Sequence, residues 1–342
     1  MRKGSFLNNG LGGIPQNAVW VRLPRFIGDS MMIHQALEPL RATGVPLVAW
    51  GSAHLMELFE GSSAFNAVYR DPQGKPGALE SAKVLRKYKA TAVINLPRST
   101  RALLAGYLAR VPVRLGWREA GGRILATASL PFKGLKGHQV ERYHALIHRG
   151  FLNLGDVIHR PFRPRPEAEA QAAQVCREYG LGGKFVLLSL GAMSWNKRLG
   201  TAVWVDLIQR LQSEDIRFAL MGGSGEDERQ AHAISESVPG IVDLTGLYPL
   251  STTAALVARS SAVVANDSGI GHMAAACQVP VVSIFGPTTP EVSAPYSRRT
   301  TVLQKEGLDC LGCHRFDCPV EGHPCMNAIK AERIFTAVKA YI

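Results

Sequence analysis

The stretch 262–288, AVVANDSGIGHMAAACQVPVVSIFGPT, places two apolar runs on either side of a short segment of small residues. The first run breaks at 266–269, where polar and small residues predict a turn followed by a helix over 271–277. Pro280 opens the second run, which ends at Gly286 and Pro287. Strand, turn, helix and strand in this order predict a parallel α/β sheet.

The turn after the first of these strands is a candidate anion-binding site. In a parallel sheet it lies at the carboxyl end of its strand, where ligands collect. Ser268 and Gly269 place backbone N–H groups at a helix N-terminus, and these groups suit an anion. Asp267 and Ser268 could instead serve only as helix caps. His272 favours a binding site, because a cation in the first turn opposes the helix dipole and needs another reason to be there.

The same alternation of strand and helix recurs along the chain. Short apolar runs predict further strands at 18–23, 46–50, 67–70, 91–96, 113–117, 185–190 and 217–221. The stretch 155–166 holds three prolines and three arginines without apolar periodicity, and this composition is typical of an interdomain linker. The prediction is therefore an α/β protein of two Rossmann-like, doubly wound domains, 1–155 and 156–342.

Composition narrows the class of partner. The 342 residues are 46% hydrophobic, enough for two cores, and carry a formal charge of +12. This charge predicts an acidic partner: nucleic acid, anionic lipid or a phosphorylated substrate. Aromatic residues make up only 7% and no nucleic-acid-binding motif is present, so nucleic acid is disfavoured. Neither a secretory signal nor an uncharged run that could span a bilayer is present, which predicts a cytoplasmic location.

The motifs NDSGIGH and IFGPT resemble the C-terminal domain of glycosyltransferase family 9, the lipopolysaccharide core heptosyltransferases, and within it the heptosyltransferase II group. The resemblance implies a GT-B fold, in which two Rossmann-like domains face a central cleft. It implies inverting transfer of heptose from ADP-heptose to a Kdo-lipid A or heptosyl-Kdo2-lipid A acceptor. The enzyme would work peripherally at the anionic inner face of the inner membrane. No DxD motif is apparent, so the transfer is expected to need no cofactor.

Two other functions fit parts of the sequence. A nucleotide-sugar epimerase with the same fold would bind a sugar nucleotide and release an isomer without any acceptor. A non-catalytic factor that binds lipid A or another anionic glycolipid, or that responds to a metal, would use the positive charge and the clustered cysteines.

The predicted acceptor domain contributes one acid and four arginines. From spacing alone, Gly28 and Asp29 form a turn and a helix N-cap; the resemblance implies instead that Asp29 is the general base. Arginines follow two of the predicted strands and could bind phosphates or carboxylates bidentately, or form a solvated surface. The resemblance favours acceptor binding, because the acceptor carries phosphates and acidic sugars. The four arginines are Arg98, Arg101, Arg118 and Arg123.

The predicted donor site lies in the second domain. A loop that begins at Gly191 leads to Lys197 and Arg198, and the resemblance implies that Lys197 contacts the donor diphosphate. The Trp-Pro that usually follows in the family is replaced here by Leu-Gly. Glu226 follows a glycine-rich turn and is expected to bind the ribose hydroxyls, although an acid there could merely complement the helix dipole. The full predicted donor set is Gly191, Lys197, Arg198, Glu226, Asp267, Ser268, Gly269 and His272, with 245–247 bordering the base.

Four cysteines fall within sixteen residues: Cys310, Cys313, Cys318 and Cys325, in the pattern C-x2-C-x4-C-x6-C. They could bind a structural zinc or another metal, act as redox-active or disulfide-forming thiols, or share no role. The segment 309–326 has no apolar periodicity, so it cannot order itself by burying a hydrophobic face. The prediction is therefore a structural zinc site that anchors a final helix over 327–342.

Overall fold

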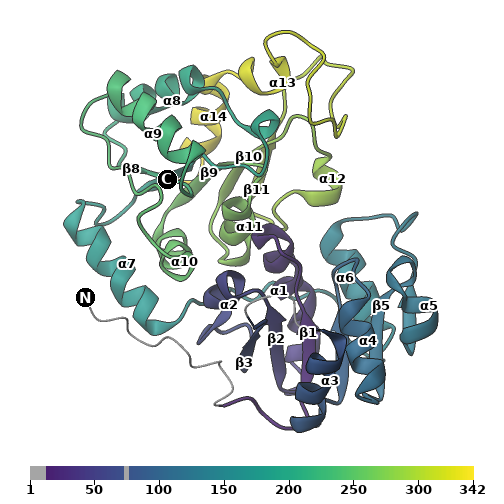
Figure 1. The fold of residues 1–342 in the computed structure, drawn as a ribbon. Helices are drawn as coiled ribbons and strands as arrows, with labels where there is room; N and C mark the ends of the chain where they lie inside the picture. The colour runs from purple at the N-terminus through teal and green to yellow at the C-terminus, as the bar shows by residue number, and fades with distance from the viewer. Residues whose placement is uncertain (1–12, 73–76) are drawn as a thin grey trace. The chain divides into compact units, whose positions relative to one another are not determined.

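The computed structural model describes residues 13–72 and 77–342. The chain divides into two compact units, Met1–Ile158 and His159–Ile342, drawn from purple to blue and from teal to yellow in Figure 1. Each unit contains one parallel sheet with helices between successive strands, which confirms the predicted α/β class. Within these described ranges, every helix is too short or too polar to cross a lipid bilayer.

The first unit is a six-stranded parallel sheet in the order β3-β2-β1-β4-β5-β6. Its elements are β1 (Val19–Arg22), α1 (Ile27–Arg41), β2 (Leu47–Gly51), α2 (Ala53–Phe59), β3 (Ala67–Arg70), α3 (Ala78–Lys87), β4 (Ala92–Asn95), α4 (Arg101–Leu108), β5 (Val113–Trp117), η1 (Arg118–Ala120), α5 (Gly122–Leu125), β6 (Ala128–Leu130) and α6 (Gln139–His148). This is the Rossmann strand order, in which the chain reverses direction across the sheet between β1 and β4. Ligands of such sheets bind beyond the carboxyl ends of those two strands.

The second unit is a five-stranded parallel sheet in the order β11-β10-β9-β7-β8. Its elements are α7 (Pro166–Glu178), β7 (Val186–Ser189), η2 (Trp195–Lys197), α8 (Thr201–Ser213), β8 (Phe218–Met221), α9 (Glu226–Ser237), α10 (Leu250–Arg259), β9 (Ala262–Asn266), α11 (Gly269–Ala276), β10 (Val281–Ile284), α12 (Pro290–Ser293), β11 (Thr300–Leu303), α13 (Pro324–Asn327) and α14 (Ala331–Lys339). Its switch point lies between β7 and β9. The loops that follow β7 and β9 are therefore the expected ligand loops.

Apolar spacing explains how the helices pack. In α8 the four residues at helical spacing, Trp204, Leu207, Ile208 and Leu211, are fully buried in the core of the second unit. In the first unit, Trp20 of β1 is fully buried and makes edge contacts with Trp50 and Tyr69. Each buried aromatic ring removes a large apolar area from water, so these contacts fix the sheets that carry the sites.

The helix α1 begins earlier than the sequence predicts. Its expected start was Ser30, but the helix begins at Ile27, after Phe26 in an extended conformation. The reason is that Gly28 and Asp29 adopt helical geometry instead of forming a separate turn. As a result Asp29 lies in the first turn of α1, where its negative charge complements the helix dipole.

Two other elements differ from the sequence prediction. The final helix, expected over 327–342, is shorter: α14 begins at Ala331, because Lys330 is extended, and ends at Lys339. Ile334 and Val338 are buried in α14, whereas Tyr341 lies beyond its end. The edge strands β6 and β11 were not predicted, because they are three and four residues long and mostly half-buried.

Candidate functional site

The switch point of the second sheet brings Lys197 and Asp267 together. Lys197 ends η2 in the loop after β7, and Asp267 directly follows β9. The Lys197 Nζ atom lies 2.6 Å from Asp267 Oδ2, and the Thr288 hydroxyl donates to the same oxygen at 2.8 Å. The Asp267 side chain is 9% exposed and that of Lys197 is 23% exposed. The carboxylate therefore holds the ammonium group at the ligand edge of the sheet while leaving part of it open.

Asn266 fixes the loops on either side of this pair. It is fully buried at the end of β9, and its side-chain amide donates to the Leu190 carbonyl at 2.8 Å. Its side-chain oxygen accepts from the Leu199 backbone N–H at 3.1 Å. Losing either partner would leave a buried polar group unsatisfied, at a cost of about 1–3 kcal/mol. Both ends of the lysine loop (191–200) are thus tied to β9.

The N-terminus of α11 lies directly beyond Asp267. Ser268 is its extended N-cap and Gly269 its first residue. The first N–H groups of a helix have no partner within the helix, and with the helix dipole they favour an anion. The Ser268 hydroxyl oxygen is buried and has no hydrogen-bond partner among the described residues. His272 is buried one turn further along. A cationic side chain and a helix N-terminus, the two groups that a phosphate-like anion favours, thus follow β7 and β9 at the same edge of the sheet.

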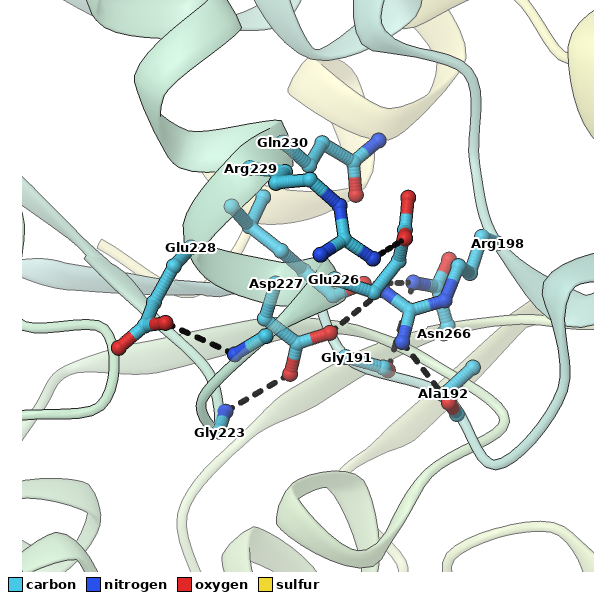
Figure 2. A network of polar contacts seen from close by, with 12 residues as sticks. Gly191, Ala192, Arg198, Gly223, Glu226, Asp227, Glu228, Arg229, Gln230 and Asn266 are labelled. Atoms are coloured by element: carbon cyan, nitrogen blue, oxygen red, sulfur yellow. Dashed lines mark hydrogen bonds and ion pairs between the residues drawn. The ribbon is translucent and has the colours of Figure 1, made fainter.

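Figure 2 shows a second ion pair beside the lysine loop, between Arg198 and Asp227. Arg198 donates to Asp227 Oδ1 at 2.5 Å and to the Ala192 carbonyl at 3.1 Å, while the Gly223 N–H donates to Asp227 Oδ2 at 2.7 Å. A Cβ atom on Gly191 would lie 2.6 Å from Asp227 Oδ2, so any other residue there would displace the Asp227 carboxylate. Asp227 therefore joins the loops after β7 and β8, a role that the sequence did not indicate.

Glu226, the predicted ribose ligand, lies next to this pair on the outside of α9. Its side chain is 56% exposed and forms an ion pair with Arg229, as Figure 2 shows. The hydrogen bond from Arg229, and then its charge, lower the pKa of Glu226. In the predicted base-pocket stretch, Leu247 is more than half exposed, and Gly246 has a φ of +70° with Glu228 packed against it.

The switch point of the first sheet contains Asp29. Tyr143 of α6 donates a hydrogen bond from its hydroxyl to Asp29 Oδ1 at 3.2 Å. Burial, and then the charge of Asp29, raise the pKa of Tyr143 well above its usual value, so the hydroxyl stays protonated near neutral pH. The positive charge of Arg98 acts on the same tyrosine in the opposite direction. No local pattern in the sequence points to this contact between Tyr143 and Asp29.

The predicted acceptor arginines of the first unit lie in two settings. Arg101 is paired with Asp71 at 3.0 Å, and Asp71 also pairs with Arg22 at 2.8 Å. Burial lowers the pKa of Arg22, whose guanidinium lies over the ring of Trp50. The Trp50 side-chain N–H donates to Asp71. Arg22 at the end of β1 and Arg101 at the start of α4 thus share the carboxylate of Asp71, which directly follows β3. One positive charge remains in excess.

The other three predicted acceptor arginines are exposed. Arg98 follows β4 and lies over the ring of Phe132 at 4.9 Å. Arg118 begins η1 and Arg123 lies in α5, so both follow β5. They have the exposure that phosphate or carboxylate binding requires.

The four clustered cysteines line one cavity of about 240 Å³, together with His323. All four are free thiols. Burial, and then the charges of the other three, raise the pKa of Cys325 to about 11. In the part of the chain that the structure describes, no three His, Cys, Asp or Glu side chains are already gathered at one metal position. The cysteines are therefore grouped without being arranged as a finished metal site.

Comparison with known proteins finds relatives in sequence and in fold. The sequence model of glycosyltransferase family 9 (heptosyltransferase) matches residues 79–323. Lipopolysaccharide heptosyltransferase 2 of Salmonella typhimurium is 27% identical over 304 residues, which are 82% of this chain and 86% of that protein. The ADP-heptose heptosyltransferase II structure from E. coli shares the fold, with a TM-score of 0.78 at 22% identity over 95% of this chain and 98% of that one. A family 9 glycosyltransferase from Veillonella parvula gives a TM-score of 0.81 at 19% identity, over 96% of this chain and 98% of that one.

Proposed function

Because this chain belongs to glycosyltransferase family 9, the heptosyltransferases, we propose that it transfers L-glycero-D-manno-heptose from ADP-heptose to the lipopolysaccharide inner core, as a heptosyltransferase II. The observation that carries the proposal is the placement of Lys197 beside the N-terminus of α11, at the switch point of the second sheet. A cationic side chain and a helix N-terminus together match the diphosphate of a nucleotide sugar.

In the proposed reaction, an acceptor hydroxyl attacks the anomeric carbon of heptose from the side opposite the diphosphate. The new carbon–oxygen bond forms as the bond to the diphosphate breaks, and ADP leaves with the electron pair. Asp29 takes the proton from the attacking hydroxyl as general base. Lys197 and the N–H groups after Asp267 stabilise the negative charge that grows on the diphosphate. The configuration at the anomeric carbon is therefore inverted.

The other predicted residues take supporting roles in this proposal. Arg198 and Gly191 shape the wall of the donor site through Asp227, and Glu226 receives the ribose hydroxyls once it exchanges Arg229 for the donor. Ser268, Gly269 and His272 belong to the helix that faces the diphosphate. The exposed Arg98, Arg118 and Arg123 bind the phosphates and acidic sugars of heptosyl-Kdo2-lipid A. Arg101 contributes through the pair that it forms with Asp71.

The net charge of +12 supports work at an anionic membrane surface. We propose that the protein associates peripherally with the cytoplasmic face of the inner membrane, where a lipid-linked acceptor would be presented. Nucleic acid has no role in this proposal.

A donor screen tests the proposed function against its rivals. Nucleotide release is measured for ADP-heptose and for other ADP- and UDP-sugars, each with and without heptosyl-Kdo2-lipid A. The proposal predicts fast ADP release only when ADP-heptose and the acceptor are both present. Isomerised donor in the absence of acceptor, detected by NMR, would favour an epimerase. Binding of the glycolipid without nucleotide release from any donor would favour a non-catalytic factor.

Replacing Tyr143 with phenylalanine should lower kcat about tenfold and leave the donor KM nearly unchanged. The reason is that Asp29 loses a hydrogen bond to a charged group, worth about 1.5–3 kcal/mol, which helps to orient the carboxylate. Steady-state kinetics with both substrates measures the effect. Tyr107→Phe is the matched control, because Tyr107 is 53% exposed in α4 and should behave like the wild type. An unchanged kcat in Tyr143→Phe would show that the hydroxyl does not position the base.

For the cysteines we propose a structural zinc ion held by Cys310, Cys313, Cys318 and Cys325. The donor set fits, because four thiols line a single cavity and thiolates are preferred zinc ligands. The side chains would have to turn toward one point to bind it. The ion would cross-link a segment that has few buried residues of its own, and it would not contact the transferred sugar.

Elemental analysis of protein purified under reducing conditions should find about one zinc per chain. The double variant Cys310→Ser, Cys313→Ser should lose this zinc and unfold at a lower temperature, because the metal's cross-links are lost. Cys176→Ser, outside the cluster, should keep the zinc. Metal-free wild-type protein, or a double variant with unchanged thermal stability, would refute the zinc site.

A further inference from the structure

The cysteine segment (309–326) contacts the lysine loop at the residues that precede Lys197. The Asn196 side-chain amide donates to the Arg315 carbonyl, and the same amide's oxygen accepts from the Ser194 hydroxyl at 2.6 Å. The ring of His323 lies 5.2 Å from that of Trp195. His323 also bonds to the Asn196 backbone. The two residues before Lys197 are therefore held by the cysteine segment.

The same segment contacts the glycine–proline turn (285–289), which carries Thr288. The Gly312 N–H donates to the Gly286 carbonyl at 3.1 Å, and the His314 N–H donates to the Pro287 carbonyl at 2.7 Å. The His314 ring and the Thr289 hydroxyl lie 3.0 Å apart. A Cβ atom on Gly286 would lie 2.8 Å from the Cys325 sulfur, so the turn fits closely against a cavity-lining thiol.

These contacts converge on one carboxylate. Lys197 and Thr288 both bond to Asp267 Oδ2, and their flanking residues are both held by the cysteine segment. The thiol-lined cavity also includes Asn196 and Pro287, one from each of the two donor-site loops. The thiols and these two loops therefore share the wall of one cavity.

We infer that the cysteine segment is a positioning element of the donor site, and that the state of its thiol cavity sets how tightly the nucleotide diphosphate is held. The inference builds on the proposed function and extends it, since it gives the segment a role beyond anchoring the last helix. When the thiols hold the proposed zinc ion, the lysine loop and the glycine–proline turn keep Lys197 and Thr288 in place. With the cavity perturbed, the loops gain freedom, and binding must then order them at a cost in affinity.

Two variants test the inference by different routes. Cys318→Ser with Cys325→Ser changes the cavity itself, whereas His323→Ala removes the contacts to Trp195 and Asn196 and keeps every thiol. The matched controls are Cys176→Ser, outside the cluster, and His232→Ala, 76% exposed on α9. ADP affinity is measured by calorimetry, and backbone hydrogen exchange is followed over 194–200 and 285–289. Both test variants should bind ADP about tenfold more weakly and exchange faster in these stretches, while the acceptor KM and the controls stay at wild-type values.

The two readouts separate failure of the inference from failure of the proposed function. Wild-type protein that does not bind ADP would contradict the proposed donor, and hydrogen exchange would still test whether the segment orders the loops. Wild-type exchange in both loops of His323→Ala, together with wild-type ADP affinity, would overturn the inference. If the double cysteine variant does not fold, the wild type is measured instead. Its zinc is removed with a chelator and then restored, and ADP affinity and loop exchange are followed at each step. If neither the removal nor the restoration of zinc changes loop exchange or ADP affinity, the inference is overturned as well.

Discussion

Asp29→Asn should lower kcat by roughly 10²–10⁴-fold, the usual contribution of a general base. The substitution keeps the size of the side chain and its ability to accept the hydrogen bond from Tyr143. It removes the negative charge that would take the proton from the acceptor hydroxyl. The donor KM should change little, because Asp29 belongs to the first unit, whereas the predicted donor residues all belong to the second.

Steady-state kinetics with ADP-heptose and heptosyl-Kdo2-lipid A measures this effect. Asp156→Asn is the matched control, since that carboxylate is exposed near the division between the units. Thermal unfolding of both variants should match the wild type, which separates lost chemistry from lost structure. Near-normal turnover by Asp29→Asn would remove Asp29 from the role of base.

Lys197→Met should lower kcat/KM for the donor by roughly 10²–10³-fold, the scale expected when one preorganised donor to a growing negative charge is removed. Two effects combine in this variant. The diphosphate loses its ammonium partner, and Asp267 keeps its negative charge beside the site with only the Thr288 hydroxyl bonded to the same oxygen. ADP should therefore bind more weakly as well, because an uncompensated carboxylate repels an anion.

Lys197→Arg should recover part of the lost activity, since it restores the charge with a different shape. Lys184→Met is the control, because Lys184 is exposed in the same unit and its ammonium group donates a hydrogen bond to the carbonyl of Ile342. Calorimetry with ADP and donor kinetics give the two readouts. Wild-type ADP affinity in Lys197→Met would exclude Lys197 from the diphosphate site.

The fold could be predicted largely from the sequence because its signals are local. Apolar runs broken by glycine and polar residues mark most of the strands, and the buried residues of α8 follow the helical spacing that its sequence shows. Strand order could not be predicted, because it depends on pairing between distant segments. The short edge strands β6 and β11 were missed for a related reason, since edge strands bury less and show weaker patterns.

In the candidate site, too, single residues could be predicted from local patterns, but contacts between distant residues could not. Lys197 and Asp267 could be singled out from their loops, but the bond between them joins residues 70 positions apart. Tyr143 lies 114 positions from Asp29, so no local pattern could connect them. Asp227 was passed over for Glu226 because two adjacent acids at a helix start look alike in sequence. In the structure, one turns inward to Arg198 and the other outward to Arg229.

We expect the chain to move a heptosyl group onto an acceptor with inversion. The direct test is to incubate the protein with ADP-heptose and heptosyl-Kdo2-lipid A, and to analyse the recovered glycolipid by mass spectrometry and NMR. The account predicts a glycolipid heavier by one heptose, joined with an anomeric configuration opposite to that of the donor, and one ADP released per heptose added. An unchanged glycolipid alongside consumed or isomerised donor would contradict it.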